Sequence, residues 1–360
     1  MRRILLGPQR YVQGEGELVN IGRCIGGFGS SALLVAAHSG YERVEARLAE
    51  AAARSPFRLV LAAFGGEITR AEIDRLSELQ RAAQCDVVVG LGGGKALDTA
   101  KAVAHRSRRP CITVPTIAST DAPCSSLAVV YTAEGVFESA MLFDRNPDVV
   151  LVDTQIIADA PVRFLVSGFG DALATYFEAR AASRAFAPNV AGANSTRAAI
   201  AITEECYRIL LEDSAQAMAA VEAHVVTPAL DDIIEAIILL SGIGFESGGL
   251  GAAHSIHNGL TALPATHGCM HGEKVAFGVL AQLVLEHAAP SEVERVLAYL
   301  RSVGLPATLG QLGVERTPGN VRLVAEAAVR PGETIHRMPF PVTARDVEAA
   351  IMVADEMGSH

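Results

Sequence analysis

The chain of 360 residues contains no tryptophan, and aromatic residues make up only 5% of it. Lysine is also scarce, since Lys95, Lys101 and Lys274 are the only lysines among 30 basic residues. The formal net charge of −10 argues against a nucleic-acid partner, because neutralising phosphates needs a basic face. No run of about 18 uncharged apolar residues occurs, so we predict no membrane partner.

Cysteines at metal-binding or redox spacing are missing as well. The six cysteines are scattered and form no CxxC motif, which argues against a disulfide framework and a thiolate zinc site. The apolar stretch behind the two N-terminal arginines, residues 4–6, is too short for a signal peptide. Half of the residues are hydrophobic, which is enough for a large core. We therefore predict a cytoplasmic, globular protein, and its length suggests two domains.

Short, continuous apolar runs recur through the first 160 residues and predict strands. Most of them are followed by a helical pattern. Continuous rather than alternating apolar strands are typical of a parallel sheet that is covered on both faces. Residues 1–160 are therefore predicted to form a doubly wound, mostly parallel, Rossmann-like α/β domain. The predicted strands are 32–37, 57–64, 86–91, 111–115 and 149–153, and the predicted helices are 42–54, 69–83 and 95–105.

Beyond Pro161 the strand-like runs disappear, and long stretches rich in Ala, Leu and Glu take over. Gly, Pro and Asn cluster between these stretches, as they do between helices. Residues 161–360 are therefore predicted to form an all-helical second domain. Its best-defined helical patterns cover 170–185, 194–212, 215–225 and 230–247.

A glycine-rich turn follows the third predicted strand. Gly92, Gly93, Gly94 and Lys95 lead directly into a predicted helix, an arrangement that binds phosphate through backbone N–H groups and the helix N-terminus. Ala96 replaces the Ser or Thr that a nucleotide-hydrolase loop needs for magnesium, and the glycine spacing is GxGxG rather than GxGxxG. A tight turn that simply needs glycine is the alternative interpretation.

A segment rich in hydroxyl groups, residues 115–126, follows the fourth predicted strand. It lies at the carboxyl end of a parallel strand, where α/β sheets bind ligands. Its hydroxyls can donate to phosphate or ribose, and Asp121 can accept a hydrogen bond from a polyol hydroxyl. A turn whose side chains cap the next element explains the composition equally well.

Four of the ten histidines fall within a short stretch, at His254, His257, His267 and His271. The first two share a helix face, and the last two have the i, i+4 spacing of a second helical segment. Histidine with carboxylate is the usual ligand set for zinc or ferrous iron, so the cluster predicts a metal site. Asp171 is a candidate carboxylate, although its predicted place at the opening of a helix also fits an ordinary first-turn acid.

Together these stretches resemble the glycerol dehydrogenases of the iron-containing (metal-dependent) alcohol dehydrogenase superfamily, which has a dehydroquinate synthase-like fold. The resemblance covers nearly the whole chain, and it implies oxidation of the secondary hydroxyl of glycerol, or of a related vicinal diol, with hydride transfer to NAD. The product is an α-hydroxyketone such as dihydroxyacetone. A homo-oligomer, often an octamer, is implied too. The stretches that carry the resemblance are 92–95, 98–101, 115–132, 170–180, 244–264 and 271–278.

The resemblance also assigns roles to individual residues. It implies a catalytic divalent metal, usually Zn²⁺ although Fe²⁺ takes the same ligands, held by Asp171, His254 and His271. His257 and His267 then have supporting roles, and Asp121 holds a substrate hydroxyl. The implied cofactor-binding residues are Gly93, Gly94, Lys95, Thr116, Ser119, Ser125, Leu127 and Tyr131.

Alternatives stay open for the cofactor and the substrate. NAD-using members of the family carry an acid just after the first strand, where this chain has Ala37, His38 and Ser39. We favour NAD as the cofactor, and NADP is the alternative. A 2-oxo acid or another diol is an alternative substrate on the same fold. A dehydroquinate-synthase-like lyase is less favoured, because a phosphate-bearing substrate needs more basic residues than Lys274 and scattered arginines. A non-catalytic metal-binding protein is the least favoured.

Overall fold

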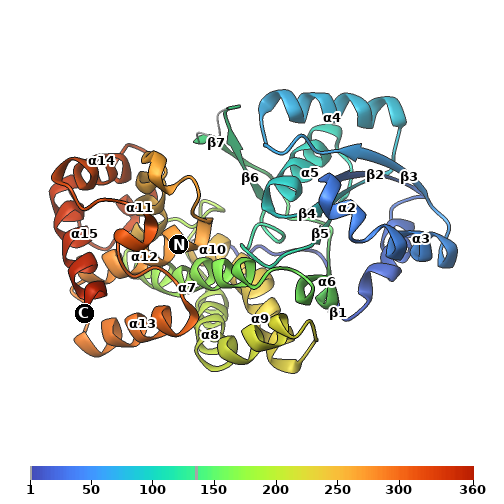
Figure 1. Cartoon of the computed structure of the whole chain (residues 1–360). Coiled ribbons are helices and arrows are strands. Elements are labelled where there is room, and N and C mark those ends of the chain that lie inside the picture. Colours follow the sequence, from blue (N-terminus) through green and yellow to red (C-terminus); the bar gives the residue numbers. More distant parts are fainter. Residues whose placement is uncertain (1, 134–136) are drawn as a thin grey trace. The chain divides into compact units, whose positions relative to one another are not determined.

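The computed structural model describes residues 2–133 and 137–360, which divide into two compact units (Figure 1). The helical unit comprises residues 2–6, Arg163–Met218 and Ile243–His360, and the α/β unit comprises Gly7–Val162 and Ala219–Gly242. The predicted division at residue 160 differs from these units in two segments. Residues 2–6 belong to the helical unit, and Ala219–Gly242 belongs to the α/β unit.

A six-stranded sheet with the strand order β1-β8-β5-β4-β2-β3 forms the centre of the α/β unit, and every pairing in it is parallel (Figure 1). Five strands agree with the predicted ranges to within one residue. They are β2 (Ser31–Ala36), β3 (Arg58–Ala63), β4 (Val87–Gly92), β5 (Cys111–Pro115) and β8 (Val149–Asp153). The edge strand β1 (Tyr11–Gly14) was not predicted, because its four residues contain no apolar run.

Alternate residues of β2 and β4 enter separate hydrophobic cores on the two faces of the sheet. In β2, Leu34 packs into the core of α1 and α3, whereas Leu33 and Val35 pack into the core of α4 and α5. Both faces are therefore buried, which is why the strands read as continuous apolar runs and why the doubly wound prediction is confirmed. The covering helices are α1 (Ile21–Gly26), α3 (Glu45–Arg54), α4 (Arg70–Ala83) and α5 (Gly94–Ser107).

A two-stranded antiparallel hairpin, β6 (Leu127–Tyr131) and β7 (Phe137–Leu142), follows the parallel strand β5. Its first strand alternates, with Ala128 and Val130 buried and the other three residues half-buried. That short alternating pattern was not recognised as a strand in the sequence. The remaining elements of the α/β unit are η1 (Glu17–Asn20), α2 (His38–Glu42), α6 (Thr154–Ala158), α9 (Pro228–Glu235) and η2 (Ala236–Leu240).

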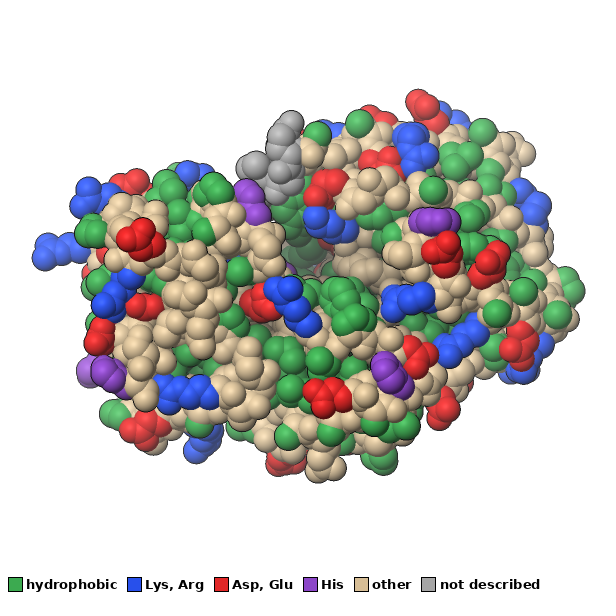
Figure 2. Space-filling view, in the orientation of Figure 1, with side chains coloured by type: hydrophobic (Ala, Val, Ile, Leu, Met, Phe, Trp, Pro, Cys, Tyr) green, Lys and Arg blue, Asp and Glu red, His purple; other side chains and the backbone are tan. Residues whose placement is uncertain are grey.

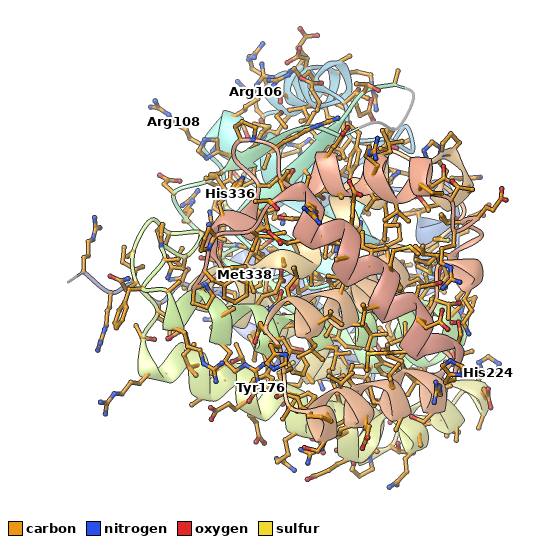
Figure 3. All side chains as sticks on the ribbon, turned by 90° about the vertical axis from the view of Figure 1, so that its left-hand side faces the viewer. Arg106, Arg108, Tyr176, His224, His336 and Met338 are labelled. Carbon is orange, nitrogen blue, oxygen red and sulfur yellow. The ribbon has the colours of Figure 1, made fainter. Side chains whose placement is uncertain are left out.

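The helical unit contains longer helices than the sequence predicts. Helix α8 (Arg197–Glu222) is continuous where two helices were expected, and Ser214 within it hydrogen-bonds to Leu210 O at 2.6 Å and pairs with the Tyr299 hydroxyl at 2.9 Å. Helix α7 (Val162–Arg184) packs on α8 through Tyr176 (Figure 3), whose ring stacks on Tyr207. The other helices are α10 (Ser241–Gly248), α11 (Ala252–Leu260), α12 (His271–Leu285), α13 (Pro290–Val303), α14 (Pro318–Ala328) and α15 (Ala344–Ser359).

Short turns join these helices: η3 (Pro264–Thr266), η4 (Gly310–Leu312) and η5 (Thr334–Arg337) are 3-10 turns. Between α9 and α10 lies η2 (Ala236–Leu240), a π-helical turn within what the sequence predicts as one helix. Such turns hold one extra residue and occur often at functional sites.

Acidic and basic side chains are interspersed among apolar ones on the face of the molecule in Figure 2. Among the described residues, no single helix has both the length and the apolar composition to cross a membrane. Only the bent combination of Pro228–Gly248 with Ala252–Leu260 meets both criteria.

Candidate active site

Three predicted metal ligands converge within the helical unit. Asp171 lies on α7, His254 on α11, and His271 is the first residue of α12. Asp171 Oδ1 is 3.0 Å from His271 Nε2 and 3.4 Å from His254 Nε2, and the three candidate ligand atoms lie within 4.8 Å of one another. One carboxylate oxygen and two imidazole nitrogens at this spacing fit a divalent zinc or ferrous ion.

Asp171 does not open a helix, as the sequence analysis expected, but lies in the middle of α7. The predicted helix began at residue 170, whereas α7 begins eight residues earlier. Gly170 allows α7 to touch α12, because a Cβ on it would lie 2.2 Å from the carbonyl oxygen of Gly272. A Cβ on Gly272 would lie 1.7 Å from the carbonyl oxygen of Ser167. This backbone contact brings the neighbouring residues, Asp171 and His271, together.

The electrostatics of the cluster favour a cation. Burial would raise the pKa of Asp171, but the charges and hydrogen bonds of His271 and His254 outweigh it and hold that pKa well below its usual range. Burial would lower the pKa of His254, yet the carboxylates of Glu178 and Asp171 raise it well above normal. The carboxylates of Asp171 and Glu178 thus stabilise positive charge at this position, where two imidazoles face Asp171.

His257 and His267, the other two histidines of the sequence cluster, are not among the three candidate metal ligands. The ring of His257 is buried and its centroid lies 4.2 Å from that of His271, and its Nδ1 is 3.1 Å from Asn258 Oδ1. Burial, followed by the charges of His271 and Lys274, lowers the pKa of His257 well below its usual range. His267 is exposed and lies at the end of η3, so its predicted helical pairing with His271 is wrong.

Sequence reasoning missed Glu178, which lies two helical turns beyond Asp171 on α7. Its Oε2 is 2.5 Å from His254 Nδ1, and its Oε1 accepts hydrogen bonds from the backbone N–H groups of Gly251 and His254, both at 3.0 Å. Glu178 thus fixes the ring of His254 with Nε2 facing Asp171. Its position, i+7 from a candidate ligand on one helix, was the available signal. Met338, labelled in Figure 3, packs beside Gly251 at the same helix start.

Glu178→Gln should weaken zinc binding by roughly 10- to 100-fold, because the amide nitrogen cannot accept the His254 hydrogen bond. Competition against a fluorescent chelator measures this affinity directly. Glu246→Gln is a matched control, since Glu246 is an equally buried glutamate of α10. An unchanged affinity in Glu178→Gln would show that His254 needs no partner to bind the metal.

The predicted phosphate-binding turn lies at the carboxyl end of β4, in the α/β unit. Gly92 has φ +145, a conformation that side-chain-bearing residues rarely adopt, and α5 begins at Gly94. Lys95 Nζ is 2.5 Å from Glu67 Oε2 and 5.5 Å from the ring centroid of Tyr131. The structure therefore brings Lys95 and Tyr131 together and adds Glu67, which the sequence analysis missed.

The hydroxyl-rich segment adjoins this turn. The backbone N–H of Thr116 donates to Gly92 O at 3.0 Å, and a Cβ on Gly94 would lie 3.4 Å from Thr120 Oγ1. Thr116 and Ser119 are both buried. The carboxyl ends of β4 and β5 therefore form one surface, as predicted from the parallel sheet.

Three more predicted residues lie on or near the hairpin. Leu127 and Tyr131 lie on one half-buried face of β6, and burial raises the pKa of Tyr131 to about 12. Ser125 is 1% exposed, and its hydroxyl pairs with Lys101 Nζ at 3.0 Å. Asp121 Oδ2 accepts a hydrogen bond from Ser241 Oγ at 2.8 Å.

A family model described as iron-containing alcohol dehydrogenase matches residues 8–154. A glycerol dehydrogenase of Escherichia coli O6:H1 is 50% identical to the chain, over 99% of the chain and 98% of that protein. The chain belongs to the iron-containing alcohol dehydrogenase family. A crystal structure of a probable glycerol dehydrogenase from Sinorhizobium meliloti 1021 matches with a TM-score of 0.94 at 43% identity, covering 99% of each chain.

A second solved structure has the same fold. The crystal structure of glycerol dehydrogenase from Schizosaccharomyces pombe matches with a TM-score of 0.96 at 35% identity, covering 99% of this chain and 91% of that one. The architecture predicted from sequence, an α/β part followed by a mostly helical part, is thus the architecture of the family.

Proposed function

We propose that the protein oxidises the secondary hydroxyl of glycerol, or of a closely related vicinal diol, to the α-hydroxyketone, with NAD as the hydride acceptor. The observation that carries this proposal is the convergence of Asp171, His254 and His271. Similarity over nearly the whole chain to proteins named glycerol dehydrogenase supports the substrate.

Asp171, His254 and His271 would hold the divalent metal, for which we propose zinc. A bound divalent metal supplies Lewis-acid chemistry, which lowers the pKa of an alcohol hydroxyl. Around it, Glu178 fixes the His254 ring, and the contact of Gly170 with Gly272 fixes the separation of the other two ligands. These residues pre-set the ligand geometry, so little reorganisation accompanies metal binding.

The glycine turn and the segment after β5 would bind NAD, whose nicotinamide accepts the hydride. The backbone N–H groups at the start of α5, with Gly93 and Gly94, would bind the pyrophosphate. Lys95 would reach a phosphate oxygen after parting from Glu67. Thr116 and Ser119 lie on the same edge of the sheet, and Leu127 and Tyr131 lie along β6, on the face that we assign to the nicotinamide.

Asp121 would accept a hydrogen bond from a substrate hydroxyl, while Ser241 holds its carboxylate in place. Asp121→Asn should therefore lower kcat/KM for glycerol by about 10- to 100-fold, the usual cost of a hydrogen bond to a charged group. The loss should be smaller with propan-2-ol, which lacks the neighbouring hydroxyl. Steady-state kinetics on both alcohols test this, and equal losses would remove Asp121 from substrate recognition.

The proposed reaction is tested by assaying the purified protein on glycerol with NAD, before and after exhaustive chelation. Turnover should disappear with the metal and return on adding zinc. The same assay with NADP and with 2-oxobutyrate separates the alternative cofactor and the 2-oxo acid substrate. Undiminished turnover after chelation, or faster reduction of 2-oxobutyrate, would contradict the proposal. We also propose a homo-oligomer, by resemblance to the family, and light scattering tests that assembly.

A further inference from the structure

Four consecutive backbone carbonyl groups between β5 and β6 each accept a hydrogen bond from a side chain of the α/β unit. Residues 122–125 lie outside any helix or strand, so these carbonyls need partners from elsewhere in the protein. The donors and acceptors are Lys101 Nζ to Ala122 O at 2.7 Å, Thr113 Oγ1 to Pro123 O at 2.9 Å, Asn146 Nδ2 to Cys124 O at 2.9 Å, and Lys101 Nζ to Ser125 O at 3.2 Å.

Lys101 makes more of these contacts than any other donor. Besides the two carbonyls, its ammonium also donates to Ser125 Oγ at 3.0 Å. It lies 2.8 Å from Asp98 Oδ1, one helical turn earlier on α5, and the side chains are only 2% and 9% exposed. The other oxygen of Asp98 accepts the backbone N–H of Val129 at 3.0 Å. The charge pair thus ties the helix behind the glycine turn to both the segment and β6.

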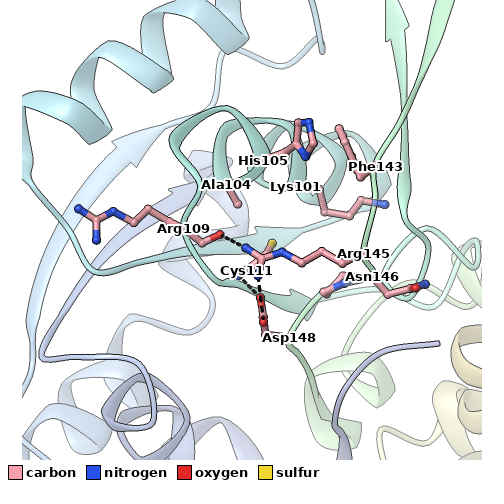
Figure 4. Close-up of a pocket in the computed structure, with 10 residues that line it drawn as sticks. Lys101, Ala104, His105, Arg109, Cys111, Phe143, Arg145, Asn146 and Asp148 are labelled. Atoms are coloured by element: carbon pink, nitrogen blue, oxygen red, sulfur yellow. Dashed lines mark hydrogen bonds and ion pairs between the residues drawn. The ribbon is translucent and has the colours of Figure 1, made fainter. Parts of the chain in front are cut away.

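A lysine suits this position better than an arginine. Its tetrahedral ammonium sends three N–H groups in different directions, whereas a guanidinium is a planar fork. The stem of Lys101 extends from α5 in the direction opposite to Arg109 in the view of Figure 4, and it lines a small cavity with Ala104 and Cys111. Buried this deeply, the side chain cannot swing out to another partner.

The segment that Lys101 fixes lies between groups with proposed roles in the reaction. Asp121 immediately precedes the four carbonyls, and Leu127 begins β6 two residues after them. Val129, whose N–H bonds to Asp98, lies on the same face of β6 as Leu127 and Tyr131. A loosened segment would therefore displace the proposed substrate carboxylate and the proposed nicotinamide face together.

We propose that Lys101 and Asp98 are positioning residues for hydride transfer. Both side chains are buried, so the pair would act through the segment that it holds and not by direct contact with substrate or cofactor. It holds residues 122–125 so that Asp121 and the β6 face keep a fixed separation. This inference rests on the proposed function, since it concerns the same reaction. Misplacement by about 1 Å can cost on the order of 100-fold in rate, so the expected effect falls on kcat.

The informative variant is the double replacement Asp98→Asn with Lys101→Met. Lys101→Met alone leaves an uncompensated buried carboxylate and can fail to fold, whereas removing both charges is often close to neutral for stability. The amide oxygen that Asp98→Asn introduces can still accept the N–H of Val129. Thr99→Val is a matched control, because Thr99 is equally buried on α5 and its hydroxyl bonds only within that helix, to Lys95 O at 2.8 Å.

With the zinc-loaded enzyme, the double variant should lower kcat for glycerol by about 10- to 100-fold and change the Kd of NADH by less than about threefold. The primary deuterium isotope effect with glycerol deuterated at C2 should rise, because hydride transfer becomes slower than product release. Thr99→Val should change neither. A kcat within about threefold of the parent, or a loss explained by the unfolded fraction, would overturn the proposal.

Hydrogen exchange separates this inference from the proposed function. Amides of residues 119–127 should exchange faster in the double variant than in the parent, with or without any substrate. If the parent fails to oxidise glycerol, the proposed function is wrong, and the kinetic comparison is made on the alcohol or oxo acid that it does turn over. Unchanged exchange in residues 119–127 would overturn the positioning role whatever the substrate.

Discussion

Asp171→Asn is expected to lower kcat/KM for glycerol by at least about 1,000-fold. The amide is a weaker ligand than the carboxylate, and it carries no charge to offset a divalent cation. Lewis-acid stabilisation by a metal is worth several kcal/mol of transition-state charge, and each 1.4 kcal/mol is about a factor of ten in rate. Mass spectrometry measures the loss of bound metal. Turnover at saturating zinc measures the loss of rate that remains when the metal is supplied in excess.

The matched control for Asp171→Asn is Asp153→Asn. Asp153 is also fully buried, but it lies in the α/β unit and accepts hydrogen bonds from the backbone N–H groups of Gly16 and Leu18. Its replacement should lower the melting temperature without changing the zinc content. Retention of one zinc per chain and of normal turnover in Asp171→Asn would remove this carboxylate from the ligand set.

Gly272→Ala should destabilise the helical unit and weaken zinc binding together. The added methyl group would lie 1.7 Å from the Ser167 carbonyl oxygen and 3.0 Å from the backbone nitrogen of Asp171, and backbone atoms cannot rotate away. Forced overpacking typically costs about 1–3 kcal/mol and sometimes more. We expect the upper end of that range, with a drop in melting temperature of about 5 °C or more.

Because α7 and α12 must separate to admit the methyl group, Asp171 and His271 should move apart as well. Zinc affinity should therefore fall by more than about tenfold in Gly272→Ala. Gly268→Ala is the control. A Cβ at Gly268 would meet nothing within 4 Å, and this glycine lies only about four residues before Gly272 in the sequence. A melting temperature equal to that of Gly268→Ala would show that α7 and α12 can separate without loss of stability.

The strands of the parallel sheet were predictable because burial on both faces leaves a direct signature, an uninterrupted apolar run such as residues 87–91. Strand β1 and the hairpin strand β6 left no such signature, since they are only partly buried. The placement of Asp171 failed for another reason. Glycine has a low helix propensity, but Gly170 lies within a helix because tertiary contact with Gly272 requires a residue without a side chain.

The residues of the candidate site were predictable from local chemistry and from family resemblance, but their supporting residues were not. Nothing near Glu178 in the sequence indicates that it bonds to His254, 76 positions away. Ser241 and Asp121 are likewise 120 positions apart. Such partners depend on how the helices fold back on one another, which no local pattern encodes. The sequence shows that lysine is rare in this chain. The contacts of Lys101 come from the structure alone.

The π-helical turn at Ala236–Leu240 makes the spacing of residues in that segment as important as their composition. A π-helical turn accommodates one residue more than an α-helical turn does, so the helix beyond it keeps the same side toward its neighbours. Ser241, which bonds to Asp121, and Gly242, whose Cβ would lie 2.7 Å from that of Cys124, follow the turn directly. A residue inserted into a regular α-helical stretch would instead rotate the side chains that follow it by about 100°. The wide turn thus lets this segment hold a further residue while Ser241 still supports the proposed substrate carboxylate.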